Sequence, residues 1–472
     1  MSSIRAVGAY APRYRLSADE VAEAWGTGGP GGIERVAVPG ADEDALTMAV
    51  AAARRALSAG DADSAALDAL AFASTTPPEA EEDPTARLGS MLGVESDAAR
   101  AAFTASTRAG TRALRWAAER EAGVALVAAS DCPRGHPADD EGRAAGAGAA
   151  ALLVGPDGPA TVEEWGEYAA AYPGTRFREQ GTDRVEGLGI TAYDRQAFRE
   201  TLSGAVEELN ADPDDATAAA VQAPDGALPY RVAKDIGVDA ERIAACETVS
   251  ELGDTGAASV PLSLAVALSD GHERVLGVSH GAGAGADALL VTGDEVPADL
   301  AIDGGAERSY AEALRLRGEI TGGPPDGGGA YVSVPTWRRS LPQRHRLVAG
   351  RCRACGTLAF PPAGACAECG DRGDFEDVRL PGTGTVEAVT TISQGGAPPE
   401  FAEQQQRAGE YDVAVVALDG PDGGQVSAPL QVTGVDPGTL DVGDRVRAAI
   451  RRIYTQEGVT RYGAKARPLD AE

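Results

Sequence analysis

Lysine is almost absent from this chain of 472 residues: only Lys234 and Lys465 occur among its 42 basic residues, and the rest are arginines. The basic residues are outnumbered by 72 acidic ones, so the formal net charge is −30. A field of this sign repels nucleic acid and anionic lipid from the molecule as a whole, although a local basic patch can still bind either. An acidic, lysine-poor and alanine-rich composition suits a protein kept soluble in concentrated salt, so we expect a halophilic protein.

Long apolar runs and a leader sequence are also missing. No stretch approaches the ~18 apolar residues of a membrane helix, and residues 2–10 lack the basic-then-apolar layout of a signal peptide. Glycine and proline, at 60 and 29 residues, fall short of a low-complexity composition, and hydrophobic residues make up 43%. We expect a soluble, cytoplasmic protein of two or three domains with no membrane association.

A segment rich in glycine and proline, 321–330, predicts a flexible linker. Before it, short apolar strands alternate with alanine-rich helical stretches, which indicates an α/β fold. The sequence Gly146–Val154 recurs as Gly283–Val291, and each copy follows a strand-like segment. We therefore predict two related halves, residues 1–160 and 161–320, each rich in βαβ units.

Both copies of this repeat begin with a run of glycines and alanines. A dinucleotide-binding fingerprint needs a strand before its glycines and a helix after them, so that the helix N-terminus faces the pyrophosphate. Here the runs lead instead into the predicted strands Ala151–Val154 and Ala288–Val291. Close backbone packing explains these glycines better than a nucleotide site does.

Four of the six cysteines lie close together, as Cys352-x2-Cys355 and Cys366-x2-Cys369 with ten residues between the pairs. Each pair presents two thiolates from one tight turn, and Zn²⁺ prefers four sulfur ligands in a tetrahedral array. Two disulfides or free thiols are the alternative, but a cytoplasmic setting keeps thiols reduced. The spacing predicts a structural zinc ion with no coordination position left for water.

The residues around the cysteines predict two further domains: an arginine-rich helix with the zinc site at 331–375, and a small antiparallel barrel at 376–472. Six arginines gather near Trp337. Arginine contacts phosphate and tryptophan can stack on a base, which favours nucleic acid, but the same residues suit the phosphates and adenine of an acyl-coenzyme A. A solvated helix that packs its apolar side on a neighbouring domain is the third alternative.

Together these motifs resemble two known families. Residues 331–468 resemble the zinc-ribbon and OB-fold proteins that accompany thiolases and acyl-CoA enzymes, and residues 1–320 resemble the 3-hydroxy-3-methylglutaryl-CoA (HMG-CoA) synthases of the thiolase superfamily. The resemblance implies duplicated, thiolase-like αβαβα layers, followed by a small zinc ribbon and an all-β OB-type barrel. The matching stretches are Gly8–Arg15, Arg108–Thr111, Pro224–Gly226, Arg231–Lys234 and Gly283–Asp287 in the first part, and Trp337–Arg339, Arg346–Cys352, Phe360–Pro362, Gly382–Val386 and Gly443–Val446 in the second.

The resemblance also locates the family's catalytic residues, and all four are replaced. The cysteine nucleophile corresponds to Thr107, the histidine to Gln222, the asparagine to Asp254 and the glutamate base to Thr76. A threonine hydroxyl attacks only with an adjacent base, and glutamine cannot exchange protons. An ionised aspartate repels a developing oxyanion, and threonine cannot act as a carboxylate base. We therefore predict that these positions do not support ordinary condensation.

Other side chains are weaker candidates for chemistry. His280 precedes Gly281 at a predicted strand end and is the histidine expected nearest to such a site, although a packed or surface histidine is the alternative. Cys132 and Cys246 are expected to be structural, because neither lies at a strand-to-helix turn that could hold a nucleophile. The candidate substrate-binding residues are Lys234, Gly283, Arg338 and Arg339.

The favoured interpretation is a catalytically degenerate relative of HMG-CoA synthase that binds acyl-CoA and zinc. It would act as a subunit or scaffold for a thiolase or synthase partner in acyl-CoA metabolism, with isoprenoid synthesis as one setting. The family's fold implies dimerisation through the sheet edge near the nucleophile helix, as a homodimer or with an active paralogue. Two alternatives stay open: an active acyl-CoA condensing enzyme or acyltransferase that uses Thr107, Ser106 or His280, and a nucleic-acid-binding zinc-ribbon protein.

Overall fold

The structure, a computed structural model, describes residues 3–26, 31–120, 123–321, 332–393 and 399–469, so the predicted linker at 321–330 lies almost wholly outside it. The chain forms two compact units: unit 1 comprises Met1–Gly89 and Val94–Ala313, and unit 2 comprises Ser90–Gly93 and Leu314–Glu472. Each unit is described by itself. None of the described helices combines the length and the hydropathy that crossing a bilayer requires.

Unit 1 is built on a large mixed sheet with the strand order β5-β4-β6-β7-β1-β8-β11-β10-β9, and a small sheet, β13-β2-β3, lies apart from it. The strands of the first half are β1 (Ser3–Tyr10), β2 (Tyr14–Ser17), β3 (Arg35–Val38), β4 (Ala69–Ala73), β5 (Ala99–Phe103), β6 (Ala125–Asp131) and β7 (Gly148–Gly155). The remaining strands are β8 (Ala160–Tyr172), β9 (Ala218–Val221), β10 (Arg274–Gly281), β11 (Gly283–Gly293), β12 (Ala298–Ala301), which pairs with β1, and β13 (Ala306–Glu307).

Helices cover this sheet and connect its strands. The α-helices are α1 (Ala18–Trp25), α2 (Ala45–Ala59), α3 (Pro84–Leu92), α4 (Ala109–Ala118), α5 (Asp140–Ala144), α6 (Thr191–Glu207), α7 (Leu228–Val232), α8 (Ala240–Ala244), α9 (Val249–Leu252), α10 (Ser259–Ser269) and α11 (Tyr310–Leu316). Short 3₁₀ turns are η1 (Ser64–Ala66), η2 (Pro213–Asp215), η3 (Ala233–Ile236) and η4 (Gly256–Ala258).

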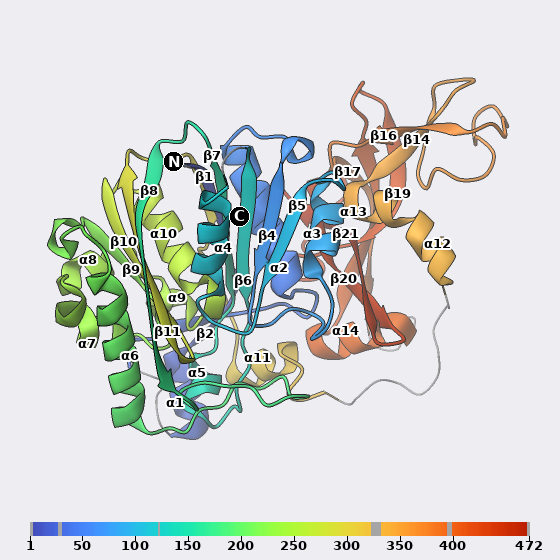
Figure 1. Ribbon diagram of the computed structural model, residues 1–472. Coiled ribbons are helices and arrows are strands. Elements are labelled where there is room, and N and C mark those ends of the chain that lie inside the picture. The colour runs from blue at the N-terminus through green and yellow to red at the C-terminus, as the bar shows by residue number, and fades with distance from the viewer. Residues whose placement is uncertain (1–2, 27–30, 121–122, 322–331, 394–398, 470–472) are drawn as a thin grey trace. The chain divides into compact units, whose positions relative to one another are not determined.

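Five layers stack in unit 1, with α2 and α6 outside, the two halves of the sheet inside them, and α4 and α10 in the middle (Figure 1). In the strand order of the large sheet, the run from β5 to β1 continues into the run from β8 to β9 where Ser3 and Ile4 of β1 pair with Thr161 and Ala160 of β8. Helix α10 is apolar around nearly its whole circumference, as expected for a helix packed on both sides. The alanine-rich strands β4 and β9 are buried at every position, which is typical of parallel strands covered on both faces.

The internal repeat corresponds to a repeated strand arrangement. In the first half β6 pairs in parallel with β4 and antiparallel with β7, and in the second half β10 pairs in parallel with β9 and antiparallel with β11. The glycine runs lie largely inside strands β7 and β11 rather than ahead of them. The predicted duplication of αβαβα layers is confirmed, and the predicted division at residue 160 coincides with the start of β8.

Unit 2 contains a zinc-ribbon sheet and a nearly closed barrel. The ribbon strands β14 (Val348–Cys352), β15 (Leu358–Ala359) and β16 (Phe375–Arg379) take the order β15-β14-β16. The barrel is antiparallel with the order β19-β18-β17-β20-β21, and a bridge from Val432 to Ala466 nearly closes it. Its strands are β17 (Thr383–Ile392), β18 (Tyr411–Asp419), β19 (Gln425–Gln431), β20 (Arg445–Gln456) and β21 (Val459–Pro468). The helical elements are α12 (Val334–Arg339), α13 (Leu341–Arg346), η5 (Pro399–Phe401) and α14 (Ala402–Ala408).

Candidate functional site

Two of the four positions predicted to have lost a catalytic residue, Gln222 and Asp254, bond to Gly256 in the turn at residues 254–257, which leads into α10. Gln222 follows β9, is 3% exposed, and its Nε2 donates to the carbonyl oxygen of Gly256 at 3.0 Å. Asp254 accepts the N–H of Gly256 on its Oδ1 at 2.9 Å. Gln222 and Asp254 therefore bind the carbonyl oxygen and the N–H of the same residue, Gly256.

Thr76 reaches this turn through Asp131, a carboxylate at the end of β6 that is fully buried. Both the N–H and the hydroxyl of Thr76 donate to Asp131 at 2.8 Å. Three further donors come from Ser74 and Thr75, and the N–H of Ala257 donates at 2.7 Å. Because six donors occupy its two oxygens, Asp131 fixes the loops after β4 and β6 to the turn and is poorly placed to accept a substrate proton.

Thr107 lies in the tight connection between β5 and α4, where Ala105 adopts a left-handed backbone conformation with φ of 66°. Its hydroxyl donates to the main-chain oxygen of His280. Helix α4 passes so close to η4 that a Cβ at Gly110 would lie 2.3 Å from the carbonyl oxygen of Ala257. The strand–turn–helix geometry of a nucleophile position is therefore present, but its hydroxyl is bonded to an amide oxygen.

The imidazole of His280 is turned toward α6 rather than toward Thr107. Its Nδ1 lies 3.1 Å from the hydroxyl of Thr201, and its ring packs 5.0 Å from that of Phe198. The Thr201 hydroxyl donates to Ala197, so Nδ1 carries the proton in the contact between them. Burial, with the charges of Arg108 and Arg176, lowers the pKa of His280 to about 4. This histidine is neutral at pH 7 and is engaged in packing.

Asp254 is paired with Arg176, which comes from the irregular segment between β8 and α6. The Asp254 side chain is 4% exposed and that of Arg176 is 18% exposed. Burial disfavours the charged guanidinium, but Asp254 outweighs it, so the pKa of Arg176 lies above its ordinary value. The same segment is held by a bond of 2.6 Å from Arg178 to the carbonyl oxygen of Thr75.

Sequence reasoning missed Asp131 and Arg176. A signal existed for Asp131, because Ser74–Thr76 follow β4 and Asp131 ends β6, and these two strands are parallel neighbours. The carboxyl ends of such strands meet at one sheet edge. No local pattern marks Arg176, since the segment around it has neither helical nor strand periodicity.

The two cysteines of unit 1 are poor nucleophiles. Burial, with the charges of Asp44 and Asp131, raises the pKa of Cys132 to about 12. Burial likewise raises the pKa of Cys246 to about 12. Since the thiolate is the reactive form, both side chains are inert near pH 7, in line with the structural role predicted for them.

The candidate substrate-binding residues are surface residues. Lys234 lies in η3 and Gly283 begins β11, where its N–H contacts the Thr175 hydroxyl at 3.4 Å. Arg338 and Arg339 lie at the end of α12, and all four residues are exposed. No hydrogen bond links Lys234 with Gly283 within the described parts of the chain.

Trp337 is 8% exposed and is enclosed by side chains of unit 2. The guanidinium groups of Arg344 and Arg461 lie 4.4 and 4.8 Å from its ring, and Tyr454 packs edge-on at 6.3 Å. Burial, together with the charge of Arg461, lowers the pKa of Arg344. A ring packed in this way is not available for stacking on a base, so the arginine cluster loses its aromatic contact for nucleic acid.

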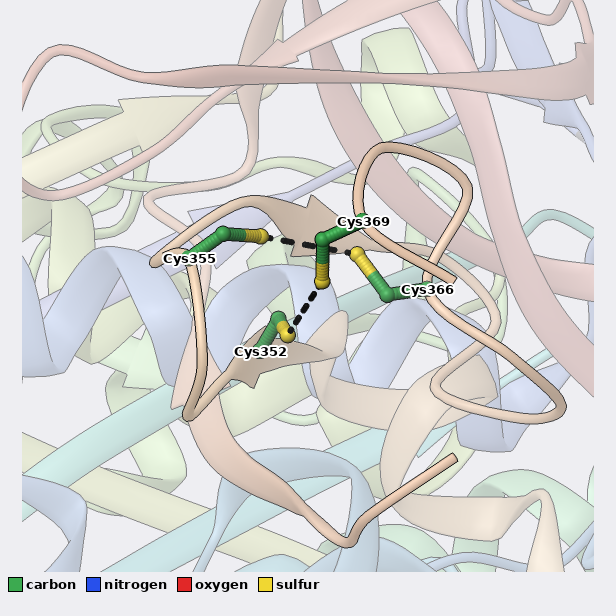
Figure 2. Close-up of side chains that lie close together, drawn as sticks. All are labelled: Cys352, Cys355, Cys366 and Cys369. Carbon is green, nitrogen blue, oxygen red and sulfur yellow. Dashed lines mark hydrogen bonds between the residues drawn. The ribbon is translucent and has the colours of Figure 1, made fainter. Parts of the chain in front are cut away.

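The four ribbon cysteines converge from two equivalent turns (Figure 2). Cys352 and Gly356 form one turn, with the Gly356 N–H donating to the Cys352 carbonyl oxygen at 2.8 Å, and Gly370 donates to Cys366 at 2.9 Å in the other. The glycines have φ of 79° and 71°, conformations that other residues adopt at a cost.

The sulfur positions fit a tetrahedral metal ion. All four sulfurs lie within 4.8 Å of one another, the closest pairs being Cys352–Cys369 at 3.7 Å and Cys355–Cys366 at 3.6 Å. Zn–S bonds of about 2.3 Å in a tetrahedron place sulfurs about 3.8 Å apart. None of these cysteines is in a disulfide. The zinc-ribbon prediction is supported, and these four residues would hold the ion.

Comparison with known proteins divides the chain in the same way. Residues 339–376 match the family model of the ChsH2 rubredoxin-like zinc ribbon domain, and residues 377–451 match that of the ChsH2 C-terminal OB-fold domain. Hydroxymethylglutaryl-CoA synthase of Thermococcus gammatolerans is 32% identical over 296 residues, covering 60% of this chain and 84% of the relative. That of Methanopyrus kandleri is 32% identical over 297 residues, covering 60% and 85%.

Solved structures show the same fold. An HMG-CoA synthase complexed with CoA has a TM-score of 0.60 and 18% identity, covering 70% of this chain and 94% of that one. 3-Oxoacyl-[acyl-carrier-protein] synthase III from Aquifex aeolicus has a TM-score of 0.55 and 18% identity, covering 62% and 100%. By its sequence relatives the chain belongs to the hydroxymethylglutaryl-CoA synthase family, with a ChsH2-type zinc ribbon and OB fold after the family's thiolase-like part.

Proposed function

We propose that this protein is a non-condensing member of its family that binds acyl-CoA and serves as a subunit or scaffold for a thiolase or HMG-CoA synthase partner. Its setting would be acyl-CoA metabolism in the cytoplasm, with isoprenoid synthesis as one candidate pathway. The proposal has two parts, retention of the ligand and loss of the chemistry, and each is open to its own measurement.

The hydrogen bond made by the Thr107 hydroxyl is the main support for the loss of condensing chemistry. That hydroxyl donates to the main-chain oxygen of His280, while the His280 ring bonds Thr201 on the other side of the strand. A threonine becomes a nucleophile only when a base takes its proton. Neither Gln222 nor the paired carboxylate of Asp254 is placed to do so, because the one does not titrate and the other is bound to Arg176.

The first part is supported by the preserved scaffold. The fold is that of the HMG-CoA synthase complexed with CoA, over 94% of that chain. The tight turn before α4 and the close approach of α4 to η4 are present, while Thr107, Gln222, Asp254 and Thr76 stand at the positions where the resemblance implies reactive groups. A protein that keeps this frame without its reactive groups is suited to holding a thioester unchanged.

Two assays on the full chain, in salt matched to its native setting, test both parts. Calorimetric titration with CoA and acetyl-CoA is expected to show binding. Condensation of acetyl-CoA with acetoacetyl-CoA is expected to show no turnover above a blank, and Thr107→Cys alone is expected to leave it absent because no base faces that position. Turnover by the wild type that disappears in Thr107→Ala would show that the protein is an active condensing enzyme.

The subunit role rests on a free sheet edge. Strand β5 ends the large sheet, and a second sheet can extend an exposed edge of this kind. Light scattering is expected to show a homodimer, or a complex when a thiolase or synthase from the same cell is added. Ala102→Glu, which places a charge on the exposed side of β5, is expected to dissociate it, whereas Ala240→Glu on α8 serves as the matched control. A chain that stays monomeric with every such partner would contradict this role.

A further inference from the structure

The replaced centre contains two buried polar atoms without hydrogen-bond partners among the described residues. One is Oε1 of Gln222, an acceptor, and the other is Nη2 of Arg176, a donor. The partner atoms of the same side chains are both used, since Nε2 of Gln222 donates to Gly256 and Nη1 of Arg176 pairs with Asp254. A buried polar atom left in this state destabilises the fold unless a water or a ligand serves it.

Both side chains border the turn at residues 254–257. Gly256 receives the amide of Gln222 on its carbonyl oxygen and gives its own N–H to Asp254, the partner of Arg176. The centre therefore offers one acceptor, on a side chain bonded to Gly256, and one donor, on a side chain bonded through Asp254 to the same residue. A hydroxyl group can satisfy both, because it donates and accepts, whereas a ketone only accepts and a methylene group does neither.

The charges around Arg176 restrict the rest of the ligand. Asp254, Asp131 and Glu141 all act on the guanidinium. Because these carboxylates, Asp254 above all, already balance the charge of Arg176, an acyl chain that ends in another carboxylate gains little attraction there and loses its hydration. An uncharged chain has no such desolvation cost.

We propose that Gln222 and Arg176 recognise the hydroxyl group of an uncharged hydroxyacyl thioester. Arg176 donates a hydrogen bond to the hydroxyl oxygen, and Oε1 of Gln222 accepts a hydrogen bond from the O–H. The inference rests on the proposed function, because it takes acyl-CoA binding as given. It adds the class of acyl group and the two residues that select it.

Titration of the full chain with four thioesters tests the selection: butyryl-CoA, acetoacetyl-CoA, 3-hydroxybutyryl-CoA and HMG-CoA. We expect 3-hydroxybutyryl-CoA to bind roughly 10- to 100-fold more tightly than butyryl-CoA, which is the effect of two hydrogen bonds to buried groups. Acetoacetyl-CoA is expected to fall between them, and HMG-CoA to bind more weakly than 3-hydroxybutyryl-CoA.

The variant Gln222→Leu removes the acceptor and is expected to reduce the preference for 3-hydroxybutyryl-CoA over butyryl-CoA to roughly tenfold or less, which is what the remaining hydrogen bond from Arg176 supplies. Gln431→Leu is the matched control, because Oε1 of Gln431 is also buried without a partner among the described residues but lies in the barrel. A thermal melt of each variant establishes that it is folded.

Equal affinity of the wild type for butyryl-CoA and 3-hydroxybutyryl-CoA would overturn the inference and leave the proposed function standing, with water serving the two atoms. If no thioester and no CoA binds, the proposed function is wrong and the inference falls with it. A hydroxyl preference that is undiminished in Gln222→Leu would also refute the assignment.

Discussion

Removal of one member of the Arg176–Asp254 pair gives a sharp test of how this centre is stabilised. In Arg176→Gln the carboxylate of Asp254, whose side chain is 4% exposed, loses its counter-charge and keeps the N–H of Gly256 as a partner. Removing one partner of a buried ion pair costs roughly 3–5 kcal/mol, because the remaining charge stays desolvated. Asp131 lies nearby and adds repulsion. We expect a loss of about 3 kcal/mol in the free energy of unfolding.

The other single variant should cost less. Asp254→Asn introduces the amide that the resemblance implies for this position, and it leaves Arg176 with Asp131 and Glu141 as stabilising charges. These carboxylates partly replace the lost charge, so we expect a loss of about 1–2 kcal/mol. The double variant has neither charge and should be only ~1–2 kcal/mol less stable than the wild type, since a neutral pair of similar size needs little solvation.

Urea denaturation at constant high salt measures the three variants and gives the coupling energy, which we expect to be about 2–3 kcal/mol. The exposed pair Arg199–Asp235, with N and O 2.9 Å apart, provides the control cycle. An exposed pair of this kind is expected to couple by less than ~1 kcal/mol. Equal coupling in the two cycles would refute the view that burial makes the Arg176–Asp254 pair important.

Three further predictions concern the zinc, a histidine and the tryptophan cluster. Elemental analysis is expected to find one zinc per chain, and a strong chelator or Cys355→Ser to destabilise the ribbon, whereas metal-free protein with two disulfides by mass spectrometry would contradict this. Because the pKa of His280 is lowered to about 4, the unfolded chain binds a proton first as pH falls. The contribution of neutral His280 to the free energy of unfolding is then fully present above pH ~6.5 and falls by about 1–3 kcal/mol toward pH 4. Urea titrations at several pH values should show a smaller dependence on pH in His280→Gln. Trp337→Ala should lower the free energy of unfolding by about 3 kcal/mol and Trp337→Phe by less, measured by thermal and urea unfolding; equal losses would argue against ring packing between the arginines.

Elements defined by local patterns could be predicted closely from the sequence. The strands predicted at Ala151–Val154 and Ala288–Val291 lie within β7 and β11. The antiparallel barrel predicted at 376–472 contains β17 to β21. Alternation of apolar residues and the spacing of the cysteine pairs depend on residues close together in the chain, so both can be recognised from the sequence alone.

The site could not be predicted as well from the sequence, because its contacts join segments that are far apart along the chain. Asp131 and Thr76 are 55 residues apart, and Arg176 and Asp254 are 78 apart. Trp337 and Arg461 likewise meet only in the folded barrel. Family resemblance named four replaced positions, but it gave no indication of what the new side chains bind, because their partners follow no periodic pattern.

These partners explain how the four replacements can be compatible with one another. The hydroxyl of Thr107 needs an acceptor, and the main-chain oxygen of His280 supplies one. The charge of Asp254 needs a cation, and Arg176 supplies it. A cysteine at position 107 would lose its bond to the carbonyl oxygen and still face no base, and an asparagine at 254 would leave an arginine without its main counter-charge. Thr107 and Asp254 are therefore each stabilised by a contact that the residue implied by the family could not make equally well, so we expect reversal of either position alone to weaken the packing without supplying a base.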